Sequence, residues 1–245
     1  MKDFKPLALL SCDANNKIFE KLDSLGFITL SLPKDERLPS PIASHADTLL
    51  FCAGDTVFCN IDYYDKANSV FDTLESYGYK IIKSQAHVAD KYPNDIAFNC
   101  FTLENSIYGN INFLSKDIIY FAKKENYKLI SVKQGYAKCS TVVLGNDAVI
   151  SADKGITNAV QNAGKIALQT ENSPSAISLI GYDYGFIGGA SGVFFDTVYF
   201  TGDLNSHPDC EEIKKFCHRF NFKTLCLTEE KLCDIGGIAF FNKLS

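Results

Sequence analysis

The chain has 245 residues, of which 46% are hydrophobic, and its formal net charge is −5 at pH 7. This composition is sufficient for a substantial core, and the negative charge without a basic cluster argues against nucleic acid as the main partner. No apolar run approaches the roughly 20 residues that cross a bilayer, so we expect no membrane partner.

The N-terminal and cysteine patterns indicate a reducing compartment. Residues 1–6 lack the long apolar core of a signal peptide. The nine cysteines include no Cys-x-x-Cys pair, and several of them lie in apolar strand patterns. We therefore expect reduced thiols, a cytoplasmic location, no metal site and no cofactor.

The clearest pattern in the sequence is a junction that occurs five times. A short amphipathic helix ends on Gly or Asn, an aromatic residue usually follows, and an apolar strand begins. The five junctions, spaced by 52, 48, 38 and 57 residues, are Gly26-Phe27, Gly78-Tyr79, Asn126-Tyr127, Gly164-Lys165 and Asn221-Phe222. A period of this size indicates one supersecondary unit repeated within a single domain, residues 1–245.

In the first two units, a helix is followed by a strand, a loop and a two-stranded hairpin. The first unit opens with a strand at 7–12, and its helix, next strand and hairpin strands are predicted at 16–25, 28–32, 48–52 and 56–59. The corresponding elements of the second unit are predicted at 66–77, 79–83, 96–103 and 106–108.

The third and fourth units follow the same plan. Ser115 is the expected N-cap of a helix that runs to residue 125. The strand and hairpin of the third unit are predicted at 128–132, 141–144 and 148–151. The fourth unit has a helix at 156–162, strands at 166–169 and 177–180, and a hairpin at 193–195 and 198–201.

The fifth unit is incomplete at its end. Its helix begins at Ser206-His207-Pro208-Asp209, which is similar to a capping box with Asp in place of Glu, and ends at Asn221. Strands at 223–227 and 238–241 follow, and the final strand of the unit is missing. The strand at 7–12 is the natural replacement, which would close the ring of units with both termini in one unit.

Five helix-plus-strands units in a closed ring resemble the pentein fold, a five-fold pseudo-symmetric α/β propeller. Amidinotransferases, arginine deiminases, agmatine deiminases and dimethylarginine hydrolases have this fold, and translation initiation factor six shares it without known catalysis. Residues 138–147 look like the repeat hairpin of the initiation-factor branch, and residues 92–98 look like the acidic strand of the hydrolases. Residues 134–139 and 185–190 are similar to an uncharacterised bacterial family of this fold.

The resemblance implies a particular chemistry. Guanidino-modifying penteins use a thiolate that attacks the guanidinium carbon, a histidine that transfers protons, and carboxylates that hold the cation. The stretch at 234–241, comparable to the one that carries the family's cysteine, contains no cysteine here. The formal matches to the family's His-x-Asp motif are His45-Ala46-Asp47 and His207-Pro208-Asp209.

Five loops are expected to meet at the centre of the ring, because the loop after each inner strand points toward the central channel. Their polar side chains suit a small polar ligand, and the four aspartates among them favour a cationic one. The predicted ligand-binding residues are Asp47, Asn94, Asp95, Gln134, Lys138, Asp183, Tyr184 and Asp234. The alternative is that Asp and Asn in these loops serve as turn formers and strand caps.

Three residues are candidates for catalysis. Cys139 is the candidate nucleophile because the adjacent Lys138 can lower the pKa of a thiol. The candidate proton carriers are His45, which lies beside Asp47, and His207. The alternatives are a buried structural cysteine, an exposed His–Asp pair in a loop, and a histidine in a helix cap.

Two classes of function remain open at this point, together with a third possibility, a decayed enzyme that retained only ligand binding. The first is a small-molecule site at the ring centre, with hydrolysis of a guanidino or amide C–N bond as the reaction that the fold suggests. The second is a non-catalytic interaction protein similar to translation initiation factor six. The ligand and the oligomeric state do not follow from the sequence.

Overall fold

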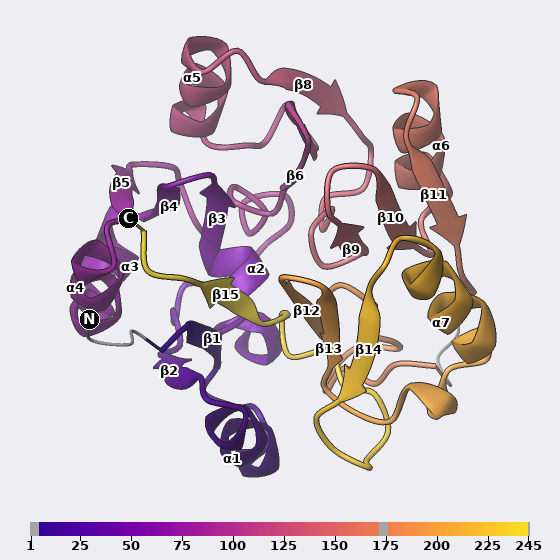
Figure 1. Cartoon of the computed structure of the whole chain (residues 1–245). Helices are drawn as coiled ribbons and strands as arrows, with labels where there is room; N and C mark the ends of the chain where they lie inside the picture. Colours follow the sequence, from indigo (N-terminus) through magenta and orange to yellow (C-terminus); the bar gives the residue numbers. More distant parts are fainter. Residues whose placement is uncertain (1–4, 172–175, 245) are drawn as a thin grey trace.

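Five separate three-stranded sheets surround a common centre in the part of the chain that the computed structural model describes, residues 5–171 and 176–244. The long helices lie on the outside of this arrangement, whereas the short, fully buried helix α2 (Ala46–Leu49) lies near the centre (Figure 1). Within the same residues, none of the helices combines the length and the apolar character needed to cross a membrane. Residues 1–4, which form most of the segment used above to judge a signal peptide, lie outside the described ranges.

Four of the sheets are built from consecutive chain segments in the order strand, strand, helix, strand. The first two strands pair antiparallel, and the third pairs parallel to the second after the helical crossover. The elements are β3 (Leu50–Ala53), β4 (Thr56–Asn60), α3 (Ile61–Lys66), α4 (Asn68–Ser76), β5 (Lys80–Ser84); β6 (Phe101–Leu103), β7 (Ser106–Gly109), α5 (Lys116–Lys124), β8 (Lys128–Ser131); β9 (Thr141–Leu144), β10 (Ala148–Ser151), α6 (Lys154–Asn162), β11 (Ile166–Gln169); and β12 (Ser191–Phe194), β13 (Thr197–Phe200), α7 (Cys210–Arg219), β14 (Lys223–Cys226).

The fifth sheet joins the two ends of the chain. β15 (Ala239–Phe241) pairs antiparallel with β1 (Leu7–Ser11), in the register Leu7 to Phe241. β1 in turn pairs parallel with β2 (Ile28–Leu32) after α1 (Asn16–Ser24). The prediction that the N-terminal strand completes the last unit is therefore confirmed.

The five helix-to-strand junctions share one backbone conformation. The residue that follows the C-cap of each of these five helices has a positive φ: 93° at Gly26, 98° at Gly78, 60° at Asn126, 79° at Gly164 and 63° at Asn221. Glycine has no Cβ to clash in this region, and asparagine tolerates it better than other residues. The repeated Gly or Asn in the sequence thus marks a left-handed helix end in all five units.

The strand that follows each crossover helix is the outermost strand of its sheet, which corrects the expectation that the central loops follow inner strands. β2, β5, β8, β11 and β14 have exposed or half-buried residues at most positions. The innermost strands are β3, β6, β9, β12 and β15, most of which contact one another around the centre (Figure 1). The long loops therefore cross from the outside of the molecule to its centre.

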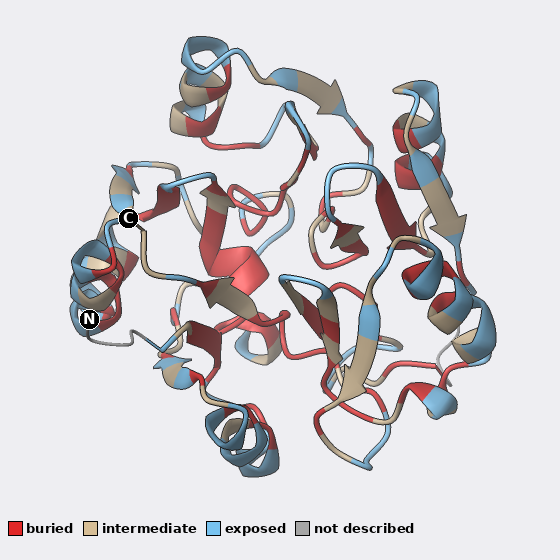
Figure 2. Cartoon of the chain, in the orientation of Figure 1, coloured by how far each residue is buried: buried red, intermediate tan, exposed pale blue. Residues whose placement is uncertain are grey.

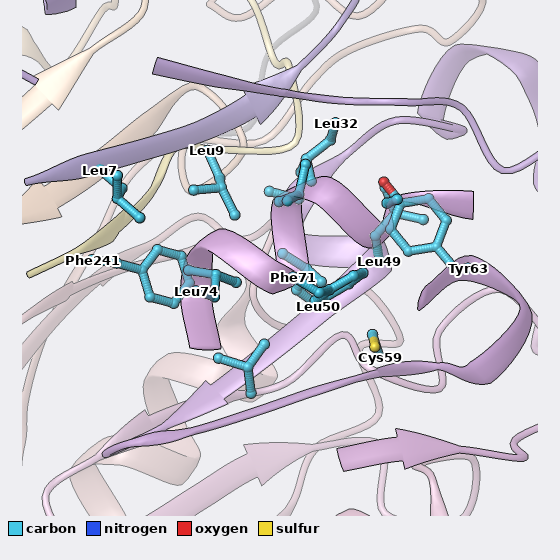
Figure 3. Close-up of a cluster of buried hydrophobic side chains, with 14 of the residues drawn as sticks. Leu7, Leu9, Leu32, Leu49, Leu50, Cys59, Tyr63, Phe71, Leu74 and Phe241 are labelled. Atoms are coloured by element: carbon cyan, nitrogen blue, oxygen red, sulfur yellow. The ribbon is translucent and has the colours of Figure 1, made fainter. Parts of the chain in front are cut away.

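The hydrophobic core lies between neighbouring units. One cluster packs Leu7, Leu9 and Leu32 of the N-terminal sheet against Phe71 and Leu74 of α4, with further side chains from the second unit (Figure 3). Figure 2 shows the buried residues on the strands and on the inner faces of the helices. Burial of one Leu or Phe side chain contributes about 1.5–3 kcal/mol, and here each unit depends on its neighbour for that burial.

Several element boundaries differ from the predictions. Residues 48–49 belong to a short helix, α2 (Ala46–Leu49), and β6 covers only the end of the apolar run at 96–103. Helix α3 was not predicted. It starts immediately after β4 because the Asn60 side chain caps it, accepting hydrogen bonds from the backbone N–H groups of Asp62 and Tyr63.

The fourth and fifth units also depart from the predictions. Residues 177–180 form no strand, and only an isolated bridge links Ser178 to Cys233. The capping box at 206–209 is wrong: Ser206 ends a short 3-10 helix (Leu204–Ser206), and α7 begins at Cys210 with Asp209 as N-cap but without a side-chain cap hydrogen bond. Pro208 separates the two helices, because the residue before a proline avoids helical conformation.

Candidate functional site

The five long loops meet at the centre and are hydrogen-bonded to one another there. The first loop bonds to the fifth through Asp47 N–H and Gly236 C=O (3.0 Å), and the fifth to the fourth through Phe186 N–H and Asp234 Oδ2 (2.8 Å). The fourth loop bonds to the third through Gly189 N–H and Cys139 C=O (2.9 Å). This layer of loops holds most of the candidate residues.

Two cavities lie against the layer. We call the first the loop-side cavity. It has a volume of about 240 Å³ and is lined by Ile42, His45, Thr48, Tyr136, Cys139, Leu179, Tyr182, Asp183, Tyr184, Phe186 and Asp234. The second, the strand-side cavity, has a volume of about 370 Å³ and lies among the inner strands, with Asp47, Lys138 and Gly236 among its lining residues.

His45 and Asp234 form a buried pair on the loop-side cavity. His45 precedes α2, and its Nδ1 lies 3.9 Å from Oδ1 of Asp234. Asp234 is fixed by two backbone donors, Phe186 N–H (2.8 Å) and Gly236 N–H (2.9 Å). Burial lowers the pKa of His45, and the Asp234 charge opposes this shift. His45 is therefore a neutral imidazole at pH 7 and can accept a proton.

Cys139 lies on the same cavity and is held by Asn99. The Asn99 side chain accepts hydrogen bonds from Lys138 N–H (2.7 Å) and Cys139 N–H (3.4 Å) and donates one to Sγ of Cys139 (3.2 Å). Burial raises the pKa of the Cys139 thiol well above its usual value, and the charges of Asp47 and Asp234 raise it further. The neighbouring Lys138 does not produce a resting thiolate.

Asp47 separates the two cavities. Asp47 lines the strand-side cavity, and its carboxyl influences the thiol of Cys139, which lines the loop-side cavity. Oδ1 accepts a hydrogen bond from Thr48 (3.3 Å), whereas Oδ2 has no partner among the described residues. Burial raises the pKa of Asp47, opposed by the hydrogen bond with Cys139 and by the charge of Lys138.

Asp47→Asn is expected to stabilise the protein by about 1–3 kcal/mol at pH 8, because it removes a buried carboxylate with an unpaired oxygen. The folded protein binds the Asp47 proton more tightly than the unfolded chain does, so ionisation of Asp47 lowers stability as the pH rises from about 4. The gain should therefore shrink toward pH 4. Urea unfolding between pH 4 and 8 measures it.

Asp183→Asn is the control for this prediction, because Asp183 is exposed and its replacement should change stability by less than about 0.5 kcal/mol at any pH. A gain for Asp47→Asn that does not vary with pH would contradict the assignment of the buried charge to Asp47.

Aromatic rings line the remainder of the loop-side cavity. The rings of Tyr136 and Phe186 lie 6.3 Å apart, and Tyr184 meets Phe186 edge to face at 5.7 Å. The Tyr136 hydroxyl donates a hydrogen bond to Asp95, whose other oxygen has no partner among the described residues. The cavity therefore combines aromatic walls with carboxylates, an arrangement that suits an organic cation.

The structure brings together only part of the predicted site. His45, Cys139, Asp183, Tyr184 and Asp234 line the loop-side cavity, Asp47 and Lys138 line the strand-side cavity, and Asp95 lies behind Tyr136.

The other three predicted residues lie on neither cavity. Gln134 donates to Asp153 (3.2 Å) and accepts from Tyr136 N–H, and Asn94 is an exposed turn residue. His207 accepts a hydrogen bond from Asp209 N–H (3.1 Å) and borders a separate small cavity.

The sequence analysis missed Asn99 and Tyr136 as residues of the site. Asn99 is fully buried within the apolar run at 96–103, and a single amide in such a run was the available signal. Tyr136 lies in a loop that was predicted to face the centre, but its contact with Asp95 spans 41 residues and left no local pattern. In residues 5–171 and 176–244, no group of three or more His, Cys, Asp or Glu side chains could hold a metal ion.

Known proteins share the fold of this chain, and none of the matches identifies its activity. The model of a family of unknown function, DUF6873, matches residues 9–239. No curated protein matches the sequence significantly.

Solved structures match over almost the whole chain. Agmatine deiminase from C. jejuni is 9% identical, with a TM-score of 0.58, and the match covers 98% of this chain and 94% of that one. A dimethylarginine dimethylaminohydrolase from Pseudomonas aeruginosa, complexed with citrulline, is 9% identical, with a TM-score of 0.55 and coverage of 91% and 92%.

An amidinotransferase from Microseira wollei, of the saxitoxin biosynthetic pathway, is 11% identical, with a TM-score of 0.57 and coverage of 91% and 88%. Identities this low show the fold alone. The predicted resemblance to the pentein superfamily is confirmed at the level of an α/β fold with five small sheets.

Proposed function

Since the chain belongs to the family of unknown function DUF6873, which names no reaction, we propose its function from the site itself. The proposed function is to bind a small cationic molecule in the loop-side cavity and to hydrolyse a C–N bond of its guanidino or amide group. The observation that carries the proposal is the position of Cys139, His45 and Asp234 on one cavity. A thiol, a neutral imidazole and a carboxylate that orients it are the groups required for nucleophilic hydrolysis.

The charge of the cavity supports a cationic ligand. Asp183 and Asp234 line it, Asp95 lies directly behind its wall, and the Lys138 side chain faces the other cavity. A cation beside Cys139 would also lower the raised pKa of the thiol, because an opposite charge within a few ångströms stabilises the thiolate. The ligand would thereby activate its own nucleophile.

The proposed reaction has two steps. In the first, Sγ of Cys139 bonds to the guanidino or amide carbon, the thiol proton passes through His45 to the departing amine, and the C–N bond breaks. In the second, water bonds to the same carbon and gives a proton to His45, the C–S bond breaks, and sulfur regains a proton. Water is consumed and an amine is released, with no other reactant.

The proposal also covers the architecture of the whole chain and its location in the cell. We propose a single domain in which the five units close a propeller, with the pairing of β15 and β1 completing the last unit. We also propose a cytoplasmic location, which nine free thiols support.

The test incubates the protein with agmatine, arginine, methylguanidine and acetamide, and measures released amine together with the thermal shift. We expect product from at least one cation and none from acetamide. Cys139→Ser should lower turnover by about 10³-fold or more while retaining the thermal shift. Cys52→Ser is the control, because Cys52 lines the strand-side cavity.

A second candidate function is binding without catalysis, and the raised pKa of Cys139 favours it. In that case, a cation would raise the melting temperature equally in wild type and Cys139→Ser, and neither would form product. If none of the four compounds shifts the melting temperature or reacts, the proposed ligand class is wrong, and an interaction protein similar to translation initiation factor six becomes the preferred alternative.

A further inference from the structure

The strand-side cavity is not used by the proposed reaction, although it is the larger of the two. Its wall is formed by the inner strands, which turn half-buried residues toward it, including Cys52, Thr102, Val143, Val193 and Phe240. Most of these side chains are apolar. The volume of about 370 Å³ lies within the range of small-molecule sites.

The polar groups of this cavity are concentrated at the loop layer. Asp47 and Lys138 both line the cavity, and each affects the other electrostatically. Oδ2 of Asp47 is buried and has no partner among the described residues. Nζ of Lys138 has only a long contact with Thr141 C=O (3.5 Å), and no carboxylate oxygen of the described residues lies within 4.0 Å of it.

These two groups are arranged as donors. Lys138 can donate up to three hydrogen bonds and carries a positive charge. Burial favours the protonated form of Asp47, which has an O–H to donate. The other acidic residue of the cavity, Glu104, is paired with Lys165 at 2.9 Å. Two donors and one net positive charge at the end of an apolar cavity are complementary to an anionic acceptor.

We propose that the strand-side cavity is a second binding site, for a small amphipathic carboxylate. The carboxylate would lie between Lys138 and Asp47, and the hydrocarbon body would lie between the inner strands. A primary amine of the same size would meet the Lys138 charge, and a neutral alcohol would leave that charge unpaired. The two cavities therefore select opposite charges, with cations on the loop side and anions on the strand side.

The test compares three probes with the same six-carbon chain: hexanoate, hexan-1-ol and hexylamine. Isothermal titration calorimetry at pH 7 measures their dissociation constants for the full chain. We expect hexanoate to bind at least about tenfold more tightly than hexan-1-ol, which corresponds to about 1.4 kcal/mol, and saturation with hexylamine to leave the hexanoate dissociation constant unchanged, because an amine would occupy only the loop-side cavity. Equal affinity for hexanoate and hexan-1-ol would overturn the proposal.

Two variants locate the binding. Lys138→Met should reduce hexanoate affinity to that of hexan-1-ol, whereas the control Lys80→Met, at an exposed position, should change nothing. Val193→Trp should fill the cavity and abolish binding of both probes while leaving Lys138 in place, which keeps the test valid if Lys138→Met does not fold. Unchanged hexanoate affinity in a folded Lys138→Met or Val193→Trp protein would also overturn the proposal.

Discussion

Gly236→Ala is expected to destabilise the protein by about 3–5 kcal/mol. Gly236 has a φ of +77°, in the region that disfavours residues with a side chain. A Cβ at this position would lie 2.2 Å from Cβ of His45 and 2.4 Å from its Cα. Because Gly236 C=O also accepts the hydrogen bond from Asp47 N–H, the first and fifth loops would have to separate.

Gly164→Ala is a matched control for this substitution. Gly164 has a φ of +79°, and an added Cβ would meet no atom within 4 Å. It should therefore cost only the backbone strain, about 1–2 kcal/mol. Urea unfolding of both variants with unchanged m-values measures the difference. Equal losses of stability would show that the loops do not approach as closely as the structure indicates.

Asn99→Ala is expected to destabilise the protein by about 2–4 kcal/mol, because it removes the acceptor of the buried Cys139 N–H and of the half-buried Lys138 N–H, and the donor to Sγ of Cys139. The third loop should loosen as a result. We expect Cys139 to react faster with an alkylating reagent in this variant, whereas Cys217, on the buried face of α7, should keep its wild-type reactivity.

Asn94→Ala is the control for Asn99→Ala, since both asparagines precede β6 in the chain but Asn94 is exposed. Its replacement should change the free energy of unfolding by less than about 0.5 kcal/mol. If both substitutions have the same small effect, Asn99 does not hold the Cys139 loop.

The repeated part of the fold could be predicted because it rests on local rules. Each left-handed helix end needs Gly or Asn, so five positions such as Gly78 and Asn126 mark the period in the sequence. The pairing of β1 with β15 followed from counting strands. Which strand of each sheet is innermost could not be predicted, because the apolar patterns of β2 and β3 do not indicate which of them lies at the centre.

The candidate site could be predicted at the level of its loops but only partly at the level of its residues. His45, Cys139 and Asp234 lie in loops that end at the centre, and the structure brings them to one cavity. His207 fitted the same His-x-Asp pattern, yet its imidazole caps a local turn by accepting from Asp209 N–H. The division into two cavities depends on which way each side chain of the layer points, and no local sequence pattern encodes that.

The electrostatic environment of Cys139 in the folded protein differs from the one that the sequence suggested. The adjacent Lys138 suggested a thiol of low pKa, since a nearby positive charge favours the thiolate. In the folded protein, burial and two aspartates act in the opposite direction, and the thiol pKa is raised. Neighbours in sequence were therefore a poor guide to the electrostatics, because Asp47 and Asp234 reach Cys139 only through the tertiary fold.

The most direct test of the central claim compares how fast each cysteine reacts with 2-chloroacetamidine, a cation, and with 2-chloroacetamide, its neutral analogue of the same size. Mass spectrometry of the native protein at pH 7 reads the rate for every cysteine, and the exposed Cys12 serves as the internal reference. We expect Cys139, relative to Cys12, to prefer the cationic reagent by about tenfold or more, because the acidic cavity concentrates the cation and the bound cation lowers the thiol pKa. The same ratio for both reagents would contradict a cation site at Cys139.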